Sequence, residues 1–261
     1  MYMNNLILAL TFLTIIPVRN SSLLKGHLSQ AATWFPFVGL IIGVILLIVD
    51  FIVFNLFQPL LAAGIVVTFW VIVTGGLHLD GLADCFDALF VPVSPERRLE
   101  ILRDPRLGSF GVIGLGLHLL LKTLVVYSIN SSLPHLSINI YQDIYQTVNN
   151  PIFTLILAPV IARWLLLLVA RQPLARSEGM GSSFTEGLTP SIFIVGAIVP
   201  LILLLCGGVK AILAFSVAML VTLVINKVAQ ARFGGVTGDV LGLTVELAEL
   251  AILLTYAVQI P

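Results

Sequence analysis

Long apolar stretches separated by short polar connections dominate the chain. These stretches cover residues 4–16, 33–57, 60–73, 110–129, 151–170, 192–206, 211–228 and 241–260. A helix needs about 20 residues to cross the hydrocarbon core of a bilayer, so the longer stretches predict transmembrane helices. The first stretch is too short for a comfortable span and predicts an interfacial or re-entrant helix. The pattern predicts an all-α, polytopic integral membrane helical bundle of about seven transmembrane spans, forming one domain over residues 1–261.

The distribution of Lys and Arg predicts the orientation of this bundle. These residues concentrate in the connections 17–30, 76–109, 171–188 and 227–240. The connections between them hold only Lys210. Because cytoplasmic loops carry an excess of Lys and Arg, we expect the four basic connections in the cytoplasm and residues 130–150 outside. A site built from the basic connections would then face the cytoplasm.

Composition narrows the classes of function. The mean hydropathy is +1.10, 10% of residues are charged, and the formal net charge is +0. A chain without a basic field is a poor nucleic-acid binder. Cys85 and Cys206 lie far apart without a CxxC pattern, which argues against a disulfide framework or a zinc site. Carboxylates are costly beside hydrocarbon, so a local cluster of them indicates a functional site.

Residues 75–87 read GGLHLDGLADCFD and form the first acidic cluster. Asp80, Asp84 and Asp87 stand at i, i+4 and i+7, which is one face of a helix. Their like charges repel, so a cation is expected between them. Hard carboxylate oxygens favour Mg²⁺ or Mn²⁺, and we assign all three residues as metal ligands and catalytic candidates. His78 either orients a ligand, acts as a base, or serves the structure alone.

A second acidic cluster occupies residues 234–249. Asp239, Glu246 and Glu249 again share a helical face. Asp239 is the fourth candidate metal ligand. Glu246 and Glu249 fall inside the last predicted span, where they either pair with cations of neighbouring helices or take part in catalysis.

Both acidic clusters open with the pattern Gly-Gly-x-x-x-Asp. A glycine pair before a helix lets backbone N–H groups approach an anion, with the positive end of the helix dipole behind them. The repeated pattern therefore predicts two walls of one phosphate- and metal-binding site. The glycines assigned to phosphate binding are Gly76, Gly235 and Gly238.

Several cations could grip phosphate oxygens. Ser94 and Pro95 predict the start of a short helix that Pro105 and Gly108 end. Arg103 and Arg106 flank Asp104 just before that end and suit bidentate contact with a diphosphate. Lys122 and Arg163 lie within predicted spans, where each must meet an acid or a phosphate. The residues assigned to substrate phosphates are Arg103, Asp104, Arg106, Lys122 and Arg163.

Taken together, these segments resemble the membrane-bound cobalamin synthase family, adenosylcobinamide-GDP ribazoletransferase. The resemblance is carried, in the family's order, by residues 12–18, 35–39, 75–84, 103–108, 178–181 and 235–242. It implies a transferase of cobalamin biosynthesis that acts on adenosylcobinamide-GDP and on α-ribazole or its 5′-phosphate, with release of GMP. It also implies Mg²⁺ as cofactor and a multi-pass position in the bacterial inner membrane. A homo-oligomer is left open.

The resemblance implies attack of a ribazole hydroxyl on the phosphorus attached to cobinamide. Ions held by the four aspartates would neutralise the diphosphate. A carboxylate not fully engaged by metal could take the hydroxyl proton, and Asp87 or Glu246 is the candidate base.

Two other functions compete with this interpretation. The Asp-Gly-x-Ala-Asp core of residues 80–84 also resembles the opening of the CDP-alcohol phosphotransferase motif. That motif continues with spacings absent from this chain. Intramembrane acids beside broken, glycine-rich helices also mark ion-coupled transporters, but here they concentrate near one predicted membrane face.

Overall fold

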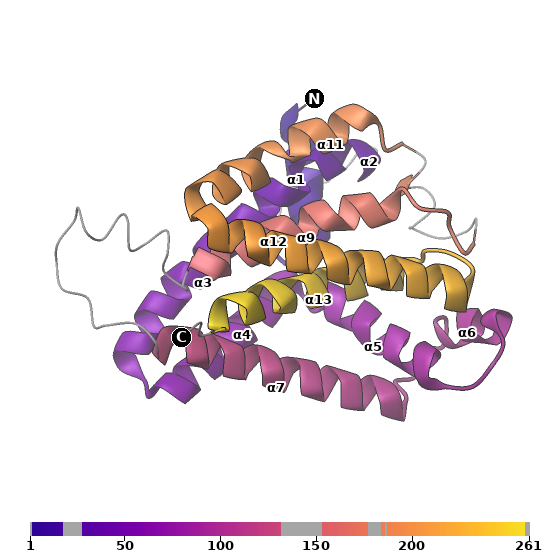
Figure 1. Cartoon of the computed structure of the whole chain (residues 1–261), viewed down its shortest axis with the longest axis horizontal. Helices are drawn as coiled ribbons and strands as arrows, with labels where there is room; N and C mark the ends of the chain where they lie inside the picture. The colour runs from indigo at the N-terminus through magenta and orange to yellow at the C-terminus, as the bar shows by residue number, and fades with distance from the viewer. Residues whose placement is uncertain (1, 18–27, 132–152, 177–183, 186, 259–261) are drawn as a thin grey trace.

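The computed structural model describes residues 2–17, 28–131, 153–176, 184–185 and 187–258. Over these residues the chain is helical, with one isolated parallel bridge between Leu174 and Val236, so the all-α prediction is confirmed (Figure 1). The helices are α1 (Tyr2–Leu13), α2 (Leu28–Ala31), η2 (Ala32–Trp34), α3 (Phe35–Leu56), α4 (Pro59–Thr74), α5 (Leu77–Phe90), α6 (Pro95–Ile101), α7 (Ser109–Ser131), α9 (Thr154–Ala170), α11 (Pro190–Gly196), α12 (Ile198–Phe233) and α13 (Gly238–Ala257). Residues 132–150 of the predicted outer loop 130–150, and the segment 178–181, lie outside the described residues.

Long apolar helices make this a multi-pass membrane protein. Four helical segments of the described chain are long and apolar enough to cross a membrane: Leu28–Leu56, Ser109–Asn130, Pro190–Phe233 and Gly238–Ala257. Helices α4 and α5 would make a fifth span, bent by 95°. Helices α1 and α9 are apolar but shorter. The count of seven spans and the interfacial position of α1 therefore stay predictions.

The stretches 192–206 and 211–228, predicted as two spans, fall within one long helical segment. Helix α12 is interrupted at Gly208, whose φ of 61° and ψ of −153° are not helical. Glycine accepts this conformation because it has no Cβ. Figure 1 shows the chain reversing direction within this segment, so that the part that follows α11 and the rest of α12 run beside each other.

Helices α9 and α13 form the centre of the bundle. Most of their residues are buried, and α3, α5, α7 and α12 pack around them. Helix α3 approaches α9 closely at Gly39 and Gly43. A Cβ at Gly39 would lie 2.8 Å from the carbonyl carbon of Pro159, and one at Gly43 would lie 2.6 Å from Ile156 Cα. This Gly-xxx-Gly step is therefore a helix-packing surface, as small residues in membrane helices often are.

Glycines also bring the two acidic helices together. Where α5 crosses α13, a Cβ at Gly81 would lie 2.7 Å from the backbone oxygen of Asp239. A Cβ at Gly242 would lie 3.0 Å from the backbone oxygen of His78. The missing side chains let the two backbones meet, which places the start of α5 directly beside the start of α13.

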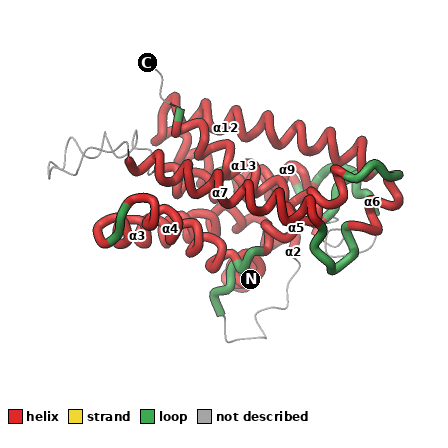
Figure 2. Tube along the Cα trace, turned by 90° about the horizontal axis from the view of Figure 1, so that it is seen from below, coloured by secondary structure: helices red, strands yellow, loops and turns green. Residues whose placement is uncertain are grey.

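The connections that matter for the site gather at one end of the bundle. Figures 1 and 2 both show α6 and its flanking loops at this end, and Figure 1 places the turn between α12 and α13 there as well. The turn between α3 and α4 and the place where the α11–α12 segment reverses direction lie toward the opposite end in Figure 1. This arrangement agrees with the grouping of basic connections in the sequence.

Candidate active site

The carboxylates of two helices converge on one cavity of about 940 Å³. Asp80 and Asp84 of α5 and Asp239 of α13 line it, and we call it the acidic pocket. Its remaining wall includes Gly75, Gly76, Leu77, Arg103, Asp104 and several apolar side chains. The structure thus brings Asp80 and Asp84 of the first acidic cluster together with Asp239 of the second. Phosphate and metal binding by these two walls stays a prediction.

Local backbone geometry positions the first wall of this pocket. Gly75 and Gly76 have φ values of 63° and 69°, in the left-handed region that favours glycine. Gly75 ends α4 and Gly76 precedes α5, which produces the sharp bend between these helices. Asp80 then lies in the first turn of α5, where the helix dipole stabilises a negative charge.

A side-chain cap positions the second wall. The Thr237 hydroxyl oxygen accepts a hydrogen bond from the Val240 N–H at 3.3 Å and donates to Asp239 Oδ2 at 3.2 Å. Arg176 Nη2 lies 3.7 Å from the same carboxylate oxygen. Sequence reasoning did not assign Arg176 to the site. Its only signal was the basic character of the connection 171–188.

The three glycines assigned to phosphate binding have different surroundings. Gly76 lines the acidic pocket. Gly235 instead packs against the backbone of residues 173–175, beside the hydrogen bond from the Ala175 N–H to the Val236 oxygen (3.0 Å). Gly238 begins α13 and lines a second, smaller pocket. Phosphate binding by these glycines stays a prediction.

Asp87 has a different environment from the one predicted for a metal ligand. Its carboxylate accepts hydrogen bonds from the backbone N–H groups of Gly108 (2.7 Å) and Gly111 (2.8 Å) at the start of α7. A side chain at either glycine would collide with this carboxylate. Asp87 therefore caps α7 and does not line the acidic pocket. Spacing along α5 alone could not show this, because its partners come from a separate helix.

The Arg103–Arg106 segment lies at the rim of the acidic pocket. Arg103 and Asp104 line the cavity, whereas the exposed Arg106 turns back on Asp104. Arg106 Nε donates to Asp104 Oδ1 at 2.9 Å and Nη2 donates to Oδ2 at 2.6 Å. The hydrogen bonds from the Arg106 side chain and backbone N–H lower the pKa of Asp104 to about 2. Arg103 is thus the guanidinium of this segment that borders the cavity.

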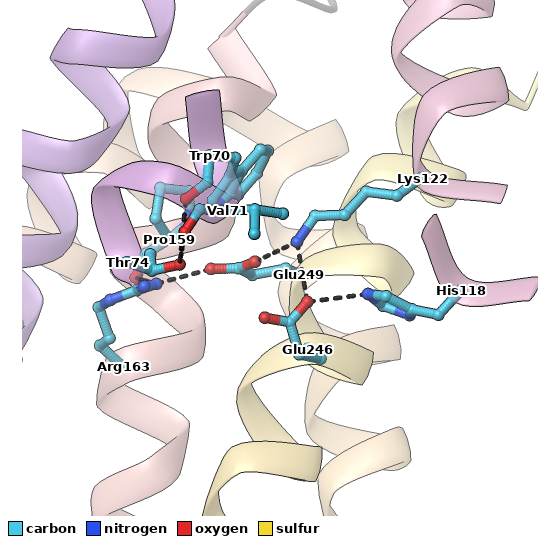
Figure 3. A network of polar contacts seen from close by, with 9 residues as sticks. All are labelled: Trp70, Val71, Thr74, His118, Lys122, Pro159, Arg163, Glu246 and Glu249. Atoms are coloured by element: carbon cyan, nitrogen blue, oxygen red, sulfur yellow. Dashed lines mark hydrogen bonds and ion pairs between the residues drawn. The ribbon is translucent and has the colours of Figure 1, made fainter. Parts of the chain in front are cut away.

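The cations predicted within the spans belong to a buried charged network, shown in Figure 3. Lys122 Nζ of α7 donates to Glu246 at 2.9 Å and to Glu249 at 2.7 Å. Arg163 Nη1 of α9 donates to Glu249 Oε1 at 2.6 Å, and His118 Nε2 lies 2.8 Å from Glu246 Oε2. All five side chains are at most 5% exposed.

This network joins helices instead of lining the acidic pocket. Lys122, Arg163 and Glu246 line neither the acidic pocket nor the smaller cavity beside it. Of the two alternatives for Glu246 and Glu249, the geometry supports pairing with cations of neighbouring helices. Lys122 also lies over the Trp70 ring, 4.1 Å from its centroid. A phosphate contact for Lys122 or Arg163, and a base role for Glu246, stay predictions without geometric support.

A second cavity of about 180 Å³ adjoins the acidic pocket. Phe12, Phe35 and Phe184 line it, and we call it the aromatic pocket. The side chains common to both cavities are Leu77, Asp80 and Asp239. His78 also lines the aromatic pocket, is 3% exposed, and its Nδ1 has no hydrogen-bond partner.

The donor set of the acidic pocket suits a hard divalent cation. No three His, Cys, Asp or Glu side chains of the described residues are already gathered in the geometry of a metal site. Mg²⁺, however, is commonly held by one or two carboxylates together with water and substrate phosphates. Asp80, Asp84 and Asp239 supply such carboxylates around a cavity large enough for a diphosphate. The residues therefore fit a magnesium ion that binds together with its substrate.

Comparison with known proteins shows which family the chain belongs to. The profile described as cobalamin-5-phosphate synthase matches residues 5–257. Adenosylcobinamide-GDP ribazoletransferases from Clostridioides difficile (34% identity, 97% of this chain and 96% of the relative), Roseiflexus (34%, 97% and 89%) and Acinetobacter baumannii (35%, 97% and 96%) are similar over nearly their whole length. No solved structure matches the chain. The chain therefore belongs to the cobalamin-5-phosphate synthase family.

Proposed function

We propose that this protein transfers α-ribazole, or its 5′-phosphate, onto adenosylcobinamide-GDP and releases GMP. Relatives that carry the name of this reaction align with 97% of the chain. The structural observation that carries the proposal is the convergence of Asp80, Asp84 and Asp239 on one cavity bordered by Arg103. Carboxylates and a guanidinium around one cavity suit a diphosphate better than an ion-transport path. The relatives' names do not point to a CDP-alcohol phosphotransferase either.

The reaction exchanges a phosphoanhydride bond for a phosphoester bond. A ribazole hydroxyl oxygen forms a bond to the phosphorus on the cobinamide side, and the bond from that phosphorus to the bridging oxygen of GMP breaks. The electron pair leaves with GMP, and the hydroxyl proton passes to a base. Phosphoryl transfer of this kind depends mainly on positioning and on neutralising charge.

The residues of the acidic pocket divide these tasks. Asp80 and Asp84, one turn apart on α5, would hold a Mg²⁺ ion with help from Asp239. When bound, this ion would supply the positive charge that a diphosphate and its leaving group require. Arg103 would contact phosphate oxygens from the rim, and Arg176 would hold Asp239 in place.

The proton acceptor should lie beside the attacking hydroxyl. Asp87 and Glu246 were the candidate bases, but Asp87 caps α7 and Glu246 is paired with Lys122. Asp80 and Asp239 line both the acidic and the aromatic pocket. One of these two carboxylates is therefore better placed to take the proton.

Turnover by the purified protein tests the proposal. The protein in detergent or lipid nanodiscs receives adenosylcobinamide-GDP, α-ribazole and Mg²⁺, and GMP release is measured. We expect GMP in amounts equal to the cobalamin formed, and loss of turnover after chelation of Mg²⁺. Asp84→Asn should lower kcat by about a hundredfold or more, because it removes a carboxylate that would hold the Mg²⁺ ion against the reacting phosphates.

Glu96→Gln is the matched control, since Glu96 is exposed on α6 and lines neither pocket. It should release GMP at the wild-type rate. Absence of GMP with either α-ribazole or its phosphate would overturn the proposed function. Full turnover by Asp84→Asn would remove Asp84 from the site.

A further inference from the structure

The aromatic pocket has the shape and chemistry of a site for a flat apolar ring. Phe35 stacks on Phe12 with ring centroids 5.8 Å apart at 16° and on Phe184 at 5.6 Å and 12°. These rings come from three separate segments of the chain. Leu28, Leu166 and Leu241 extend the apolar lining. Nucleobases bind such surfaces by stacking on aromatic side chains.

The size of this cavity limits what can occupy it. A cavity of about 150 Å³ lined by apolar side chains admits a benzene-sized ring, and the aromatic pocket has about 180 Å³. It can thus hold a ring system of one or two fused rings, but not a corrin. The larger acidic pocket, at about 940 Å³, remains for the nucleotide diphosphate.

The apolar lining of the aromatic pocket distinguishes between the bases of the two substrates. Guanine carries several donors and acceptors, which require matching partners when they are buried. The base of α-ribazole is a dimethylated benzimidazole whose one free ring nitrogen is its only hydrogen-bonding atom. Phenylalanine and leucine side chains offer no such partners, so this lining suits the benzimidazole better than guanine.

The position of the pocket agrees with an acceptor site. Asp80 and Asp239 stand at the wall shared with the acidic pocket. A nucleoside whose base lies among the phenylalanines would extend its ribose toward these two carboxylates. Its hydroxyl would then meet both a proton acceptor and the diphosphate.

From these observations we infer that the aromatic pocket is the acceptor site of the enzyme. It binds the benzimidazole base of α-ribazole against the end of this phenylalanine stack, at the Phe12 ring and beside the leucine side chains of the lining. This inference rests on the proposed function, because it names the site for one of the two proposed substrates.

Separate Michaelis constants for the two substrates test this assignment. Phe12→Ala removes one ring of the stack and should raise the KM for α-ribazole about tenfold or more, because stacking on an aromatic side chain contributes that much to base binding. The KM for adenosylcobinamide-GDP should not change. Phe12→Tyr keeps the ring and should retain the wild-type KM for α-ribazole. Phe37→Ala is the control, because Phe37 is similarly half-buried but lines neither pocket.

Direct binding separates this inference from the proposed function. Titration calorimetry with α-ribazole alone, in the absence of adenosylcobinamide-GDP, should detect binding to the wild type and a weaker affinity for Phe12→Ala. This measurement decides the inference even if no GMP is released. Equal affinity of both proteins for α-ribazole would overturn it while leaving turnover intact. A rise of KM for adenosylcobinamide-GDP alone would assign the pocket to guanine and also overturn it.

Discussion

Glu249 contacts two cations of two different helices, although no solvent reaches it. Its two oxygens accept hydrogen bonds from Lys122 of α7 and Arg163 of α9. Glu246 shares Lys122 and adds His118. The desolvation cost of these charges is offset only while every partner stays in place. The network thus links α7, α9 and α13 at the centre of the bundle.

At the residue scale we predict that Glu249→Gln destabilises the protein by about 3–5 kcal/mol, because it leaves buried cations without a full countercharge. Glu100→Gln is the matched control, since the Arg97–Glu100 pair is about two-thirds exposed, at 65% and 62%. It should cause no measurable loss. The unfolding free energy in mixed micelles gives the comparison. Equal stability of the two variants would show that the network contributes nothing.

At the scale of elements, the crossing of α5 and α13 creates the site. Gly81 and Gly242 lie at this crossing. A Cβ placed on either glycine would lie about 3 Å from a backbone oxygen of the other helix. Asp80 and Asp84 surround Gly81 in the sequence, and Asp239 precedes Gly242. The acidic residues can share one cavity because the residues between them are small.

We therefore predict that Gly81→Ala separates α5 from α13. The new methyl group would collide with the backbone of Asp239, which does not yield as a flexible side chain does. Overpacking of this kind costs about 1–3 kcal/mol. We expect that loss in unfolding free energy together with a fall in kcat of about tenfold, because the carboxylates would shift.

Gly64→Ala in α4 provides the control for this substitution. A Cβ at Gly64 meets no atom within 4 Å, so the variant should match the wild type in both measurements. Wild-type turnover by Gly81→Ala would show that the close crossing is not needed for the site.

At the scale of the whole molecule, the loops around the acidic pocket occupy one end of the bundle. The connection that carries α6 and the turn between α12 and α13 meet there, while the turn between α3 and α4 lies toward the other end (Figure 1). These site loops are the basic ones in the sequence. From the positive-inside rule we propose that the acidic pocket faces the cytoplasm.

Labelling with a membrane-impermeant maleimide tests this orientation. In a Cys206→Ser background, Gln58→Cys should react in right-side-out vesicles, because it lies in the α3–α4 turn. Glu96→Cys on α6 should react only after permeabilisation. Both positions are exposed, so burial cannot explain a difference. Labelling of Glu96→Cys from outside would reverse the proposed topology.

Local signals in the sequence were sufficient for the helical membrane class, for a helix start after Gly75–Gly76 and for the two acidic clusters. These features depend on backbone preferences and on the cost of charge beside hydrocarbon, which each segment carries by itself. The cap of α7 by Asp87 was missed, because the N–H partners lie 21 and 24 residues away.

Only the tertiary structure decided which acids meet one another and which meet cations. Asp239 and Glu246 share one helix and differ little in their local pattern. Asp239 lies beside α5 at the contact with Gly81 and lines the acidic pocket. Glu246 instead accepts a hydrogen bond from Lys122, which neutralises its charge. The neighbouring helix makes this difference, because the role of a side chain on a helical face depends on the groups that pack against it. For the same reason the aromatic pocket, which joins segments from both ends of the chain, could not be recognised in the sequence.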